Sequence, residues 1–147
     1  MEYTAVALLA RMERFGIRTK KGLGQHFLWD EQVLDAIVEA SSHSNLPVLE
    51  IGPGLGILTE KLAQHHPHVT AVEIDTAVFP ALQETMESYS NVTLVQGDAL
   101  QINLQTLMPE CYTIAANLPY QITTIDGTAA AVTGMETLCG DDTARGR

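Results

Sequence analysis

The sequence is poor in cysteine, in basic residues and in long apolar runs, and each shortage excludes a class of protein. Its 147 residues include two cysteines, Cys111 and Cys139, which are too few for a disulfide framework and lack a CxxC metal spacing. The apolar stretch over residues 5–10 follows no basic segment and is far shorter than the ~20 residues that cross a bilayer. We therefore expect a soluble protein of the reducing cytosol, without a membrane span or a metal site.

Basic residues number 8 against 18 acidic ones, so the formal charge is −10 with histidine neutral. This balance argues against a uniformly basic nucleic-acid-binding domain, although a local basic patch can still attract a polyanion. Residues 1–30 form such a patch, with five basic residues and three acidic ones. The chain is 46% hydrophobic and 18% charged, which is typical of a globular domain and excludes an acidic disordered tail.

Hydrophobic periodicity predicts an α/β fold behind a helical arm. Thr4 can cap a helix that ends near residue 14, and Asp30 can cap a second helix. Four apolar runs then predict the buried strands of a parallel sheet, with helices between the first three. The predicted strands cover residues 48–51, 69–72, 92–95 and 112–116, and the helices lie near 55–65 and 77–87.

A glycine-rich turn follows the first predicted strand. Gly52, Gly54 and Gly56 are spaced GxGxG, and Glu50 precedes the first glycine by two residues. Glycines at a strand-to-helix turn let a ligand approach the backbone, and the helix N-terminus offers free N–H groups. The spacing differs from the GxGxxG that suits a pyrophosphate. It resembles the S-adenosylmethionine loop of class I methyltransferases, although such a turn also occurs for structural reasons alone.

Acidic residues follow the next two strands. Glu73 lies 21 residues after Gly52, where a carboxylate can accept both ribose hydroxyls, whereas Asp75 is better suited to capping the next helix. After the third strand, Asp98 can accept a hydrogen bond from an adenine amine, although an isolated Gly-Asp pair would be an ordinary turn. Together these residues predict a nucleoside pocket at the carboxyl ends of the strands.

The fourth strand runs into Asn117, Leu118, Pro119 and Tyr120. Pro119 fixes the turn, Asn117 supplies an amide oxygen, and Tyr120 offers an aromatic face. Such groups can hold a flipped base by stacking and can bind its exocyclic amine through acceptors. The alternative is a plain turn that closes a strand.

These motifs, together with the stretch 20–28 (Lys-Lys-Gly-Leu-Gly-Gln-His-Phe-Leu), resemble the ribosomal RNA adenine N6,N6-dimethyltransferase family, over residues 18–124. Its bacterial small-subunit branch is the nearest likeness, and the 23S methyltransferases share the same motifs. The resemblance implies a partial class I, Rossmann-like methyltransferase domain that dimethylates two adjacent adenosines of 16S RNA. It further implies roles for individual residues. The residues implied to contact S-adenosylmethionine are His26, Leu28, Gly52, Gly54, Glu73, Asp98 and Asn117. The residues implied to hold the target amine and base are Asn117, Leu118, Pro119 and Tyr120, and those implied to contact RNA phosphates are Lys20 and Lys21.

We expect three parts: a basic arm (1–30), a partial methyltransferase domain (31–124) and a disordered tail (125–147). The tail, rich in Gly, Ala, Thr and Asp, departs from the family, and we interpret the departure as truncation or a frameshift. In the strand order 3-2-1-4, the fourth strand would then be an exposed, aggregation-prone edge. The alternative to a monomeric enzyme is a remnant that binds cofactor or RNA without turnover, and a nicotinamide oxidoreductase is disfavoured by the GxGxG spacing.

The remaining unusual residues have structural interpretations. A metal site is disfavoured for His65, His66 and His68, because they surround a proline at a helix end where imidazolium suits the helix dipole. Trp29 is expected to pack against the start of a helix. Two methionines, Met86 and Met108, are expected in the core.

Overall fold

A five-stranded sheet forms the centre of the computed structural model, which describes residues 4–18, 31–41, 45–117 and 133–139. The strand order is β3-β2-β1-β4-β5. Strands β1 to β4 pair in parallel, and β5 runs antiparallel to β4. This arrangement confirms the predicted α/β class and the order 3-2-1-4. The strands are β1 (Val48–Ile51), β2 (Val69–Glu73), β3 (Val92–Gln96), β4 (Cys111–Asn117) and β5 (Thr133–Cys139).

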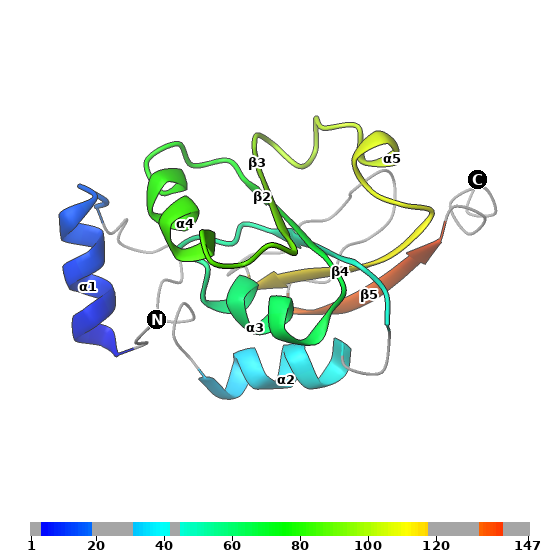
Figure 1. Cartoon of the computed structure of the whole chain (residues 1–147), viewed down its shortest axis with the longest axis horizontal. Coiled ribbons are helices and arrows are strands. Elements are labelled where there is room, and N and C mark those ends of the chain that lie inside the picture. Colours follow the sequence, from blue (N-terminus) through cyan, green and yellow to red (C-terminus); the bar gives the residue numbers. More distant parts are fainter. Residues whose placement is uncertain (1–3, 19–30, 42–44, 118–132, 140–147) are drawn as a thin grey trace.

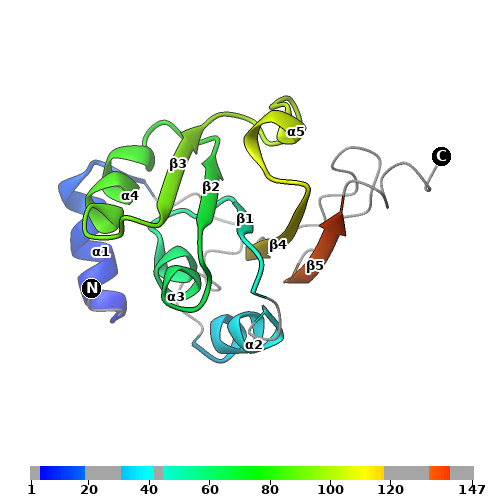
Figure 2. The same cartoon turned by 45° about the vertical axis from the view of Figure 1, so that its right-hand side comes forward.

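Helices cover both faces of the sheet. In Figures 1 and 2, α2 and α3 lie on one side and the short α5 lies on the other. The alternation of side chains along each strand explains the two layers: in β1, Val48 joins the cluster under α1, α2 and α3, and Leu49 joins the cluster under α5. The helices are α1 (Ala5–Arg14), α2 (Glu31–Ser41), α3 (Ile57–His65), α4 (Phe79–Met86) and α5 (Leu104–Leu107).

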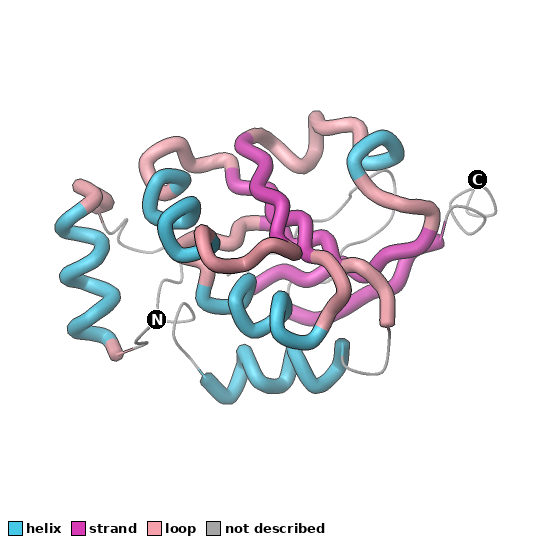
Figure 3. Tube along the Cα trace, viewed as in Figure 1, coloured by secondary structure: helices cyan, strands magenta, loops and turns pink. Residues whose placement is uncertain are grey.

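The expectation that nothing after residue 124 joins the sheet is wrong for β5. Its seven residues pair along the whole of β4, from Cys111 opposite Cys139 to Asn117 opposite Thr133. The tube in Figure 3 shows the two strands running side by side. An unpaired strand edge offers a row of backbone N–H and C=O groups, and the proline-free stretch 133–139 can satisfy them. The predicted exposed edge at β4 is therefore covered.

The helix boundaries differ from the predicted ones for local reasons. Helix α3 begins at Ile57 because Gly56, its N-cap, has a φ of 91°, a left-handed conformation that does not fit inside a helix. Asp75 does not cap α4 as expected, because the N-cap residue is Val78. Instead, Asp75 Oδ1 accepts the N–H of Ala77 at 2.9 Å and closes a turn before the helix. Helix α5, which has a single turn capped by Asn103, was not predicted.

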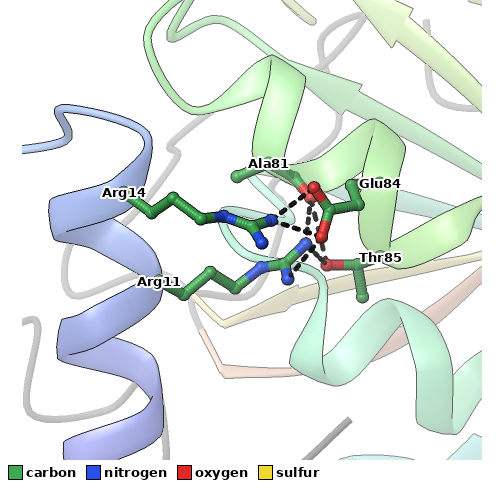
Figure 4. A network of polar contacts seen from close by, with 5 residues as sticks. All are labelled: Arg11, Arg14, Ala81, Glu84 and Thr85. Carbon is green, nitrogen blue, oxygen red and sulfur yellow. Dashed lines mark hydrogen bonds and ion pairs between the residues drawn. The ribbon is translucent and has the colours of Figure 1, made fainter.

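Helix α1 forms as predicted, and polar contacts attach it to α4. Thr4 accepts the N–H of Ala7 at the start of α1. From the other end of the helix, Arg11 donates to the carbonyl oxygen of Ala81 and to Thr85 Oγ1, both at 2.8 Å. Glu84 accepts hydrogen bonds from both Arg11 and Arg14, as the close-up in Figure 4 shows. The predicted core positions of Met86 and Met108 are confirmed, since both are nearly inaccessible to solvent.

Within the described part of the chain, no helix has the length and apolar composition needed to cross a membrane.

Candidate functional site

The carboxyl ends of the parallel strands meet at one edge of the sheet. The register pairs Ile51, the last residue of β1, with Val72 of β2 and Ala116 of β4. Likewise, Glu73 at the end of β2 pairs with Gln96 at the end of β3. The glycine-rich loop after β1, Glu73 at the end of β2, the loop after β3 and the backbone of Asn117 at the end of β4 therefore lie along one edge of the sheet. In open parallel α/β sheets, this edge is where ligands bind.

Glu73 ties the glycine-rich loop to β2. Its Oε2 accepts the backbone N–H of Gly54 at 3.0 Å, and its Oε1 accepts that of Asp75 at 3.1 Å. The pKa of Glu73 lies above its ordinary value, chiefly because burial raises it. The two hydrogen bonds lower the pKa in part, and the nearby charge of Asp75 raises it. A carboxylate has about four acceptor positions, so Glu73 can still accept hydroxyl groups from a ligand. The predicted ribose acceptor thus also shapes the loop.

Glu50 is buried beneath the same loop. Its side chain is 2% exposed, and its Oε2 has no hydrogen-bond partner among the described residues. Burial raises the pKa of Glu50 to about 8; the Thr59 hydroxyl lowers it in part, and the charge of Glu73 raises it further. A cavity of about 10 Å³ lies beside Glu50, between Leu34 and Gly52. That volume has room for about one water, so Glu50 is largely removed from bulk solvent.

The loop after β3 places a carboxylate beside an exposed apolar side chain. Asp98 Oδ1 accepts the N–H of Leu100 at 2.9 Å and thereby closes a turn. Leu100 is 61% exposed, and Ile74, between Glu73 at the end of β2 and Asp75, is 65% exposed. Large apolar side chains held this open at this edge of the sheet suit the faces of a planar ring. Sequence reasoning missed both residues, although each lies within two positions of a predicted ligand acid.

Several predicted site residues lie outside the described part of the chain. These residues come from the basic arm and from the turn after β4. For Asn117, the structure describes the backbone at the end of β4 and not the side chain. The residues outside the description are Lys20, Lys21, His26, Leu28, Leu118, Pro119 and Tyr120, together with Trp29 and the cap Asp30.

The three histidines at the end of α3 have separate polar partners. Nδ1 of His65 contacts the carbonyl oxygen of Lys61 at 2.8 Å, and Nε2 of His68 contacts Thr93 Oγ1 at 2.8 Å. His66 is buried between the carbonyl oxygen of Leu46 and Ser41 Oγ, and burial lowers its pKa. Among the described residues, no group of three or more His, Cys, Asp or Glu side chains could hold a metal ion.

Comparison with known proteins gives a consistent family match. Residues 16–125 match the family model described as "Ribosomal RNA adenine dimethylase". A ribosomal RNA small subunit methyltransferase A from Bacillus licheniformis is 42% identical over 120 residues, which are 77% of this chain and 41% of the relative. The enzyme of the same name from Macrococcus caseolyticus is 42% identical over 135 residues, which cover 84% of this chain and 46% of the relative.

The chain thus spans less than half the length of these curated relatives. Among solved structures, a dimethyladenosine transferase from Plasmodium falciparum aligns with 22% identity and a TM-score of 0.49. That alignment covers 60% of this chain and 42% of the solved one.

Proposed function

This chain belongs to the ribosomal RNA adenine dimethylase family, and we propose that it carries that family's S-adenosylmethionine site at the carboxyl edge of its sheet. The observation that supports the proposal most directly is the meeting of the GxGxG loop, Glu73 and Asp98 at one edge. The arrangement fits a nucleoside with a cationic side chain. Glu73 and Asp98 supply acceptors that suit ribose hydroxyls and an amine, and Ile74 and Leu100 offer open apolar faces.

In this proposal, the chain's own residues divide the work of binding. Glu73 accepts hydrogen bonds from the ribose hydroxyls, and Asp98 accepts one from the adenine amine. The loop N–H groups at Gly52 and Gly54 lie close to the remainder of the cofactor. S-adenosylmethionine, when bound, supplies an activated methyl group. His26 and Leu28 of the arm complete this pocket.

At the neighbouring subsite, the residues from Asn117 to Tyr120 hold the target adenine. Asn117 and the carbonyl group of Leu118 accept the two N–H groups of the exocyclic amine, which directs the nitrogen lone pair toward the methyl group. Pro119 fixes the turn and Tyr120 stacks on the base, while Lys20 and Lys21 contact RNA phosphates. The proposed reaction is N6-dimethylation of two adjacent adenosines of 16S ribosomal RNA, carried out by a cytoplasmic monomer.

A second candidate is a protein that binds S-adenosylmethionine or ribosomal RNA without turnover. The observation that favours it is that the match to the family model stops at residue 125, within this chain. The two candidates share the cofactor site and differ only in whether methyl groups are transferred.

The cofactor site is tested by calorimetric titration of the purified chain with S-adenosylmethionine. Asp98→Asn keeps the turn acceptor at Oδ1 but removes the negative charge, and we expect a roughly tenfold or larger increase in Kd, because charged acceptors contribute about 1.5–3 kcal/mol. Asp75→Asn is the matched control, since Asp75 also closes a turn by accepting the N–H two residues on. Equal effects of the two variants, or tight binding of NADH instead, would refute the site.

Methyl transfer is measured separately, by counting N6,N6-dimethyladenosine on small subunits that lack the modification. Transfer that depends on the chain supports the enzyme. Binding of the cofactor without transfer supports the non-catalytic candidate.

A further inference from the structure

The strand β5 lies outside the part of the chain that matches the family. The family model ends at residue 125, whereas β5 covers Thr133–Cys139. In Figures 1 and 2, β5 flanks β4 at the end of the sheet, and α2 also contacts it. What holds this additional strand on the sheet is therefore a property of this chain and does not depend on methyl transfer.

The strand register places the chain's only two cysteines opposite each other. Cys111 begins β4, Cys139 ends β5, and the two are partners in the antiparallel ladder. Directly opposed residues in such a ladder have Cα atoms about 4.5 or 5.5 Å apart, depending on the type of pair. Both separations lie within the range of about 4.4–6.8 Å that a disulfide spans. The register therefore brings the two backbones within the reach of a disulfide.

We propose that Cys111 and Cys139 form an intrachain disulfide site that locks β5 onto the edge of β4. The oxidant we assign is a low-molecular-weight disulfide, such as glutathione disulfide. One cysteine thiolate attacks a sulfur of this oxidant and displaces one thiolate, which leaves a mixed disulfide. The second cysteine thiolate then attacks the protein sulfur and displaces the other thiolate. The two cysteine protons end on the two released thiols, so two cysteines are oxidised and one small disulfide is reduced.

The bond closes the loop between residues 111 and 139. It fixes one end of the β4–β5 ladder, and the Asn117–Thr133 pair lies at the other end. Closing a loop of this length lowers the entropy of the unfolded chain. In a domain of this size, the bond should raise the Tm by roughly 10 °C. Reduction should release β5 and expose the β4 edge, which favours self-association.

The experiment equilibrates the full chain with mixtures of oxidised and reduced glutathione, then alkylates free thiols and maps the peptides by mass spectrometry. We expect a monomer that is two hydrogens lighter than the reduced chain, with one cross-linked peptide pair, and a Tm that falls by roughly 10 °C on reduction. The double variant Cys111→Ser/Cys139→Ser should show no dependence of Tm on the redox mixture. Two fully alkylated thiols in the oxidised mixture, or cross-links between two chains, would overturn the proposal.

A register control separates the proposed site from a loose tail that cross-links at random. In Thr137→Cys/Cys139→Ser, the thiol moves two residues along β5 to the partner position of Thr113, away from Cys111. This variant should form the intrachain bond at least tenfold less at equal glutathione ratios. Equal cross-linking would show that the β4–β5 register does not select the pair, which also overturns the proposal.

Discussion

Replacing Glu50 by glutamine should remove a large part of the pH dependence of folding. In the native protein, burial raises the pKa of Glu50 to about 8 from the ordinary value of 4.5. Between these two values, the native state holds a proton that the unfolded state has lost. Stability therefore falls as pH rises through this window, because the native state binds more protons. Glutamine keeps the shape of the protonated side chain and cannot ionise.

The size of the effect follows from the two pKa values. Each pH unit inside the window corresponds to about 1.36 kcal/mol, so the contribution of Glu50 should change by about 2–3 kcal/mol between pH 5 and pH 7. Urea unfolding at both pH values measures the free energy of unfolding of the native sequence and of Glu50→Gln. The free energy of unfolding of the native sequence should fall by about 2–3 kcal/mol more than that of the variant on going from pH 5 to pH 7.

Other groups also titrate in this range, and the comparison of the two proteins accounts for them. The raised pKa of Glu73 acts in the same direction as that of Glu50, whereas the lowered pKa of His66 acts in the opposite direction. Both groups remain in Glu50→Gln, so their contributions largely cancel in the difference. If the two proteins show the same change in stability between pH 5 and pH 7, then Glu50 is ionised in the native state and the reasoning from its burial is wrong.

The other predictions concern the packing around the sheet. Gly56→Ala should lower the free energy of unfolding, measured with denaturant, by about 1–3 kcal/mol more than Gly16→Ala does. Both glycines have positive φ, but only a Cβ at Gly56 meets side chains of α4, at 3.0 Å, so equal losses would contradict this prediction. Arg11→Ala should lower the free energy of unfolding by about 2 kcal/mol, and Arg11→Lys should restore only part of this loss, since one ammonium group cannot reproduce the contacts of the guanidinium. Full restoration by lysine would show that the charge alone is responsible. The native protein should lose stability as pH falls through 6.5, because the lowered pKa of His66 means that the unfolded state takes up the proton first, and His66→Gln should not show this loss. If stability depends on pH in the same way in both proteins, His66 does not have this role.

The parts of the fold that sequence reasoning predicted correctly depend on local signals. The four parallel strands are short apolar runs, and α1 carries its own cap at Thr4, so each could be located without knowledge of its neighbours. The boundaries of α3 and α4 depend on backbone conformations at Gly56 and Val78 that periodicity does not encode. Helix α5 is too short to show a period at all.

The errors share a different cause, which is pairing between distant segments. Strand β5 has no apolar alternation of the kind that marks a buried strand, and its position depends on the backbone edge that β4 offers. In the same way, the environment of Glu50 depends on Leu34 of α2, Leu58 of α3 and the loop above it. Neither a spacing rule nor a composition identifies a buried, protonated carboxyl group, because desolvation depends on every segment packed around it.

Glu73 shows why a single role assigned from sequence is incomplete. Its position 21 residues after Gly52 predicts a ligand acceptor, yet in the structure both of its oxygens accept backbone N–H groups, from Gly54 and Asp75. Since a carboxylate can accept about four hydrogen bonds, the structural and the ligand-binding roles can coexist on one side chain. Removal of Glu73 would therefore change the loop as well as any ribose contact. For that reason, Asp98, which closes only a local turn, gives the cleaner test of the cofactor site.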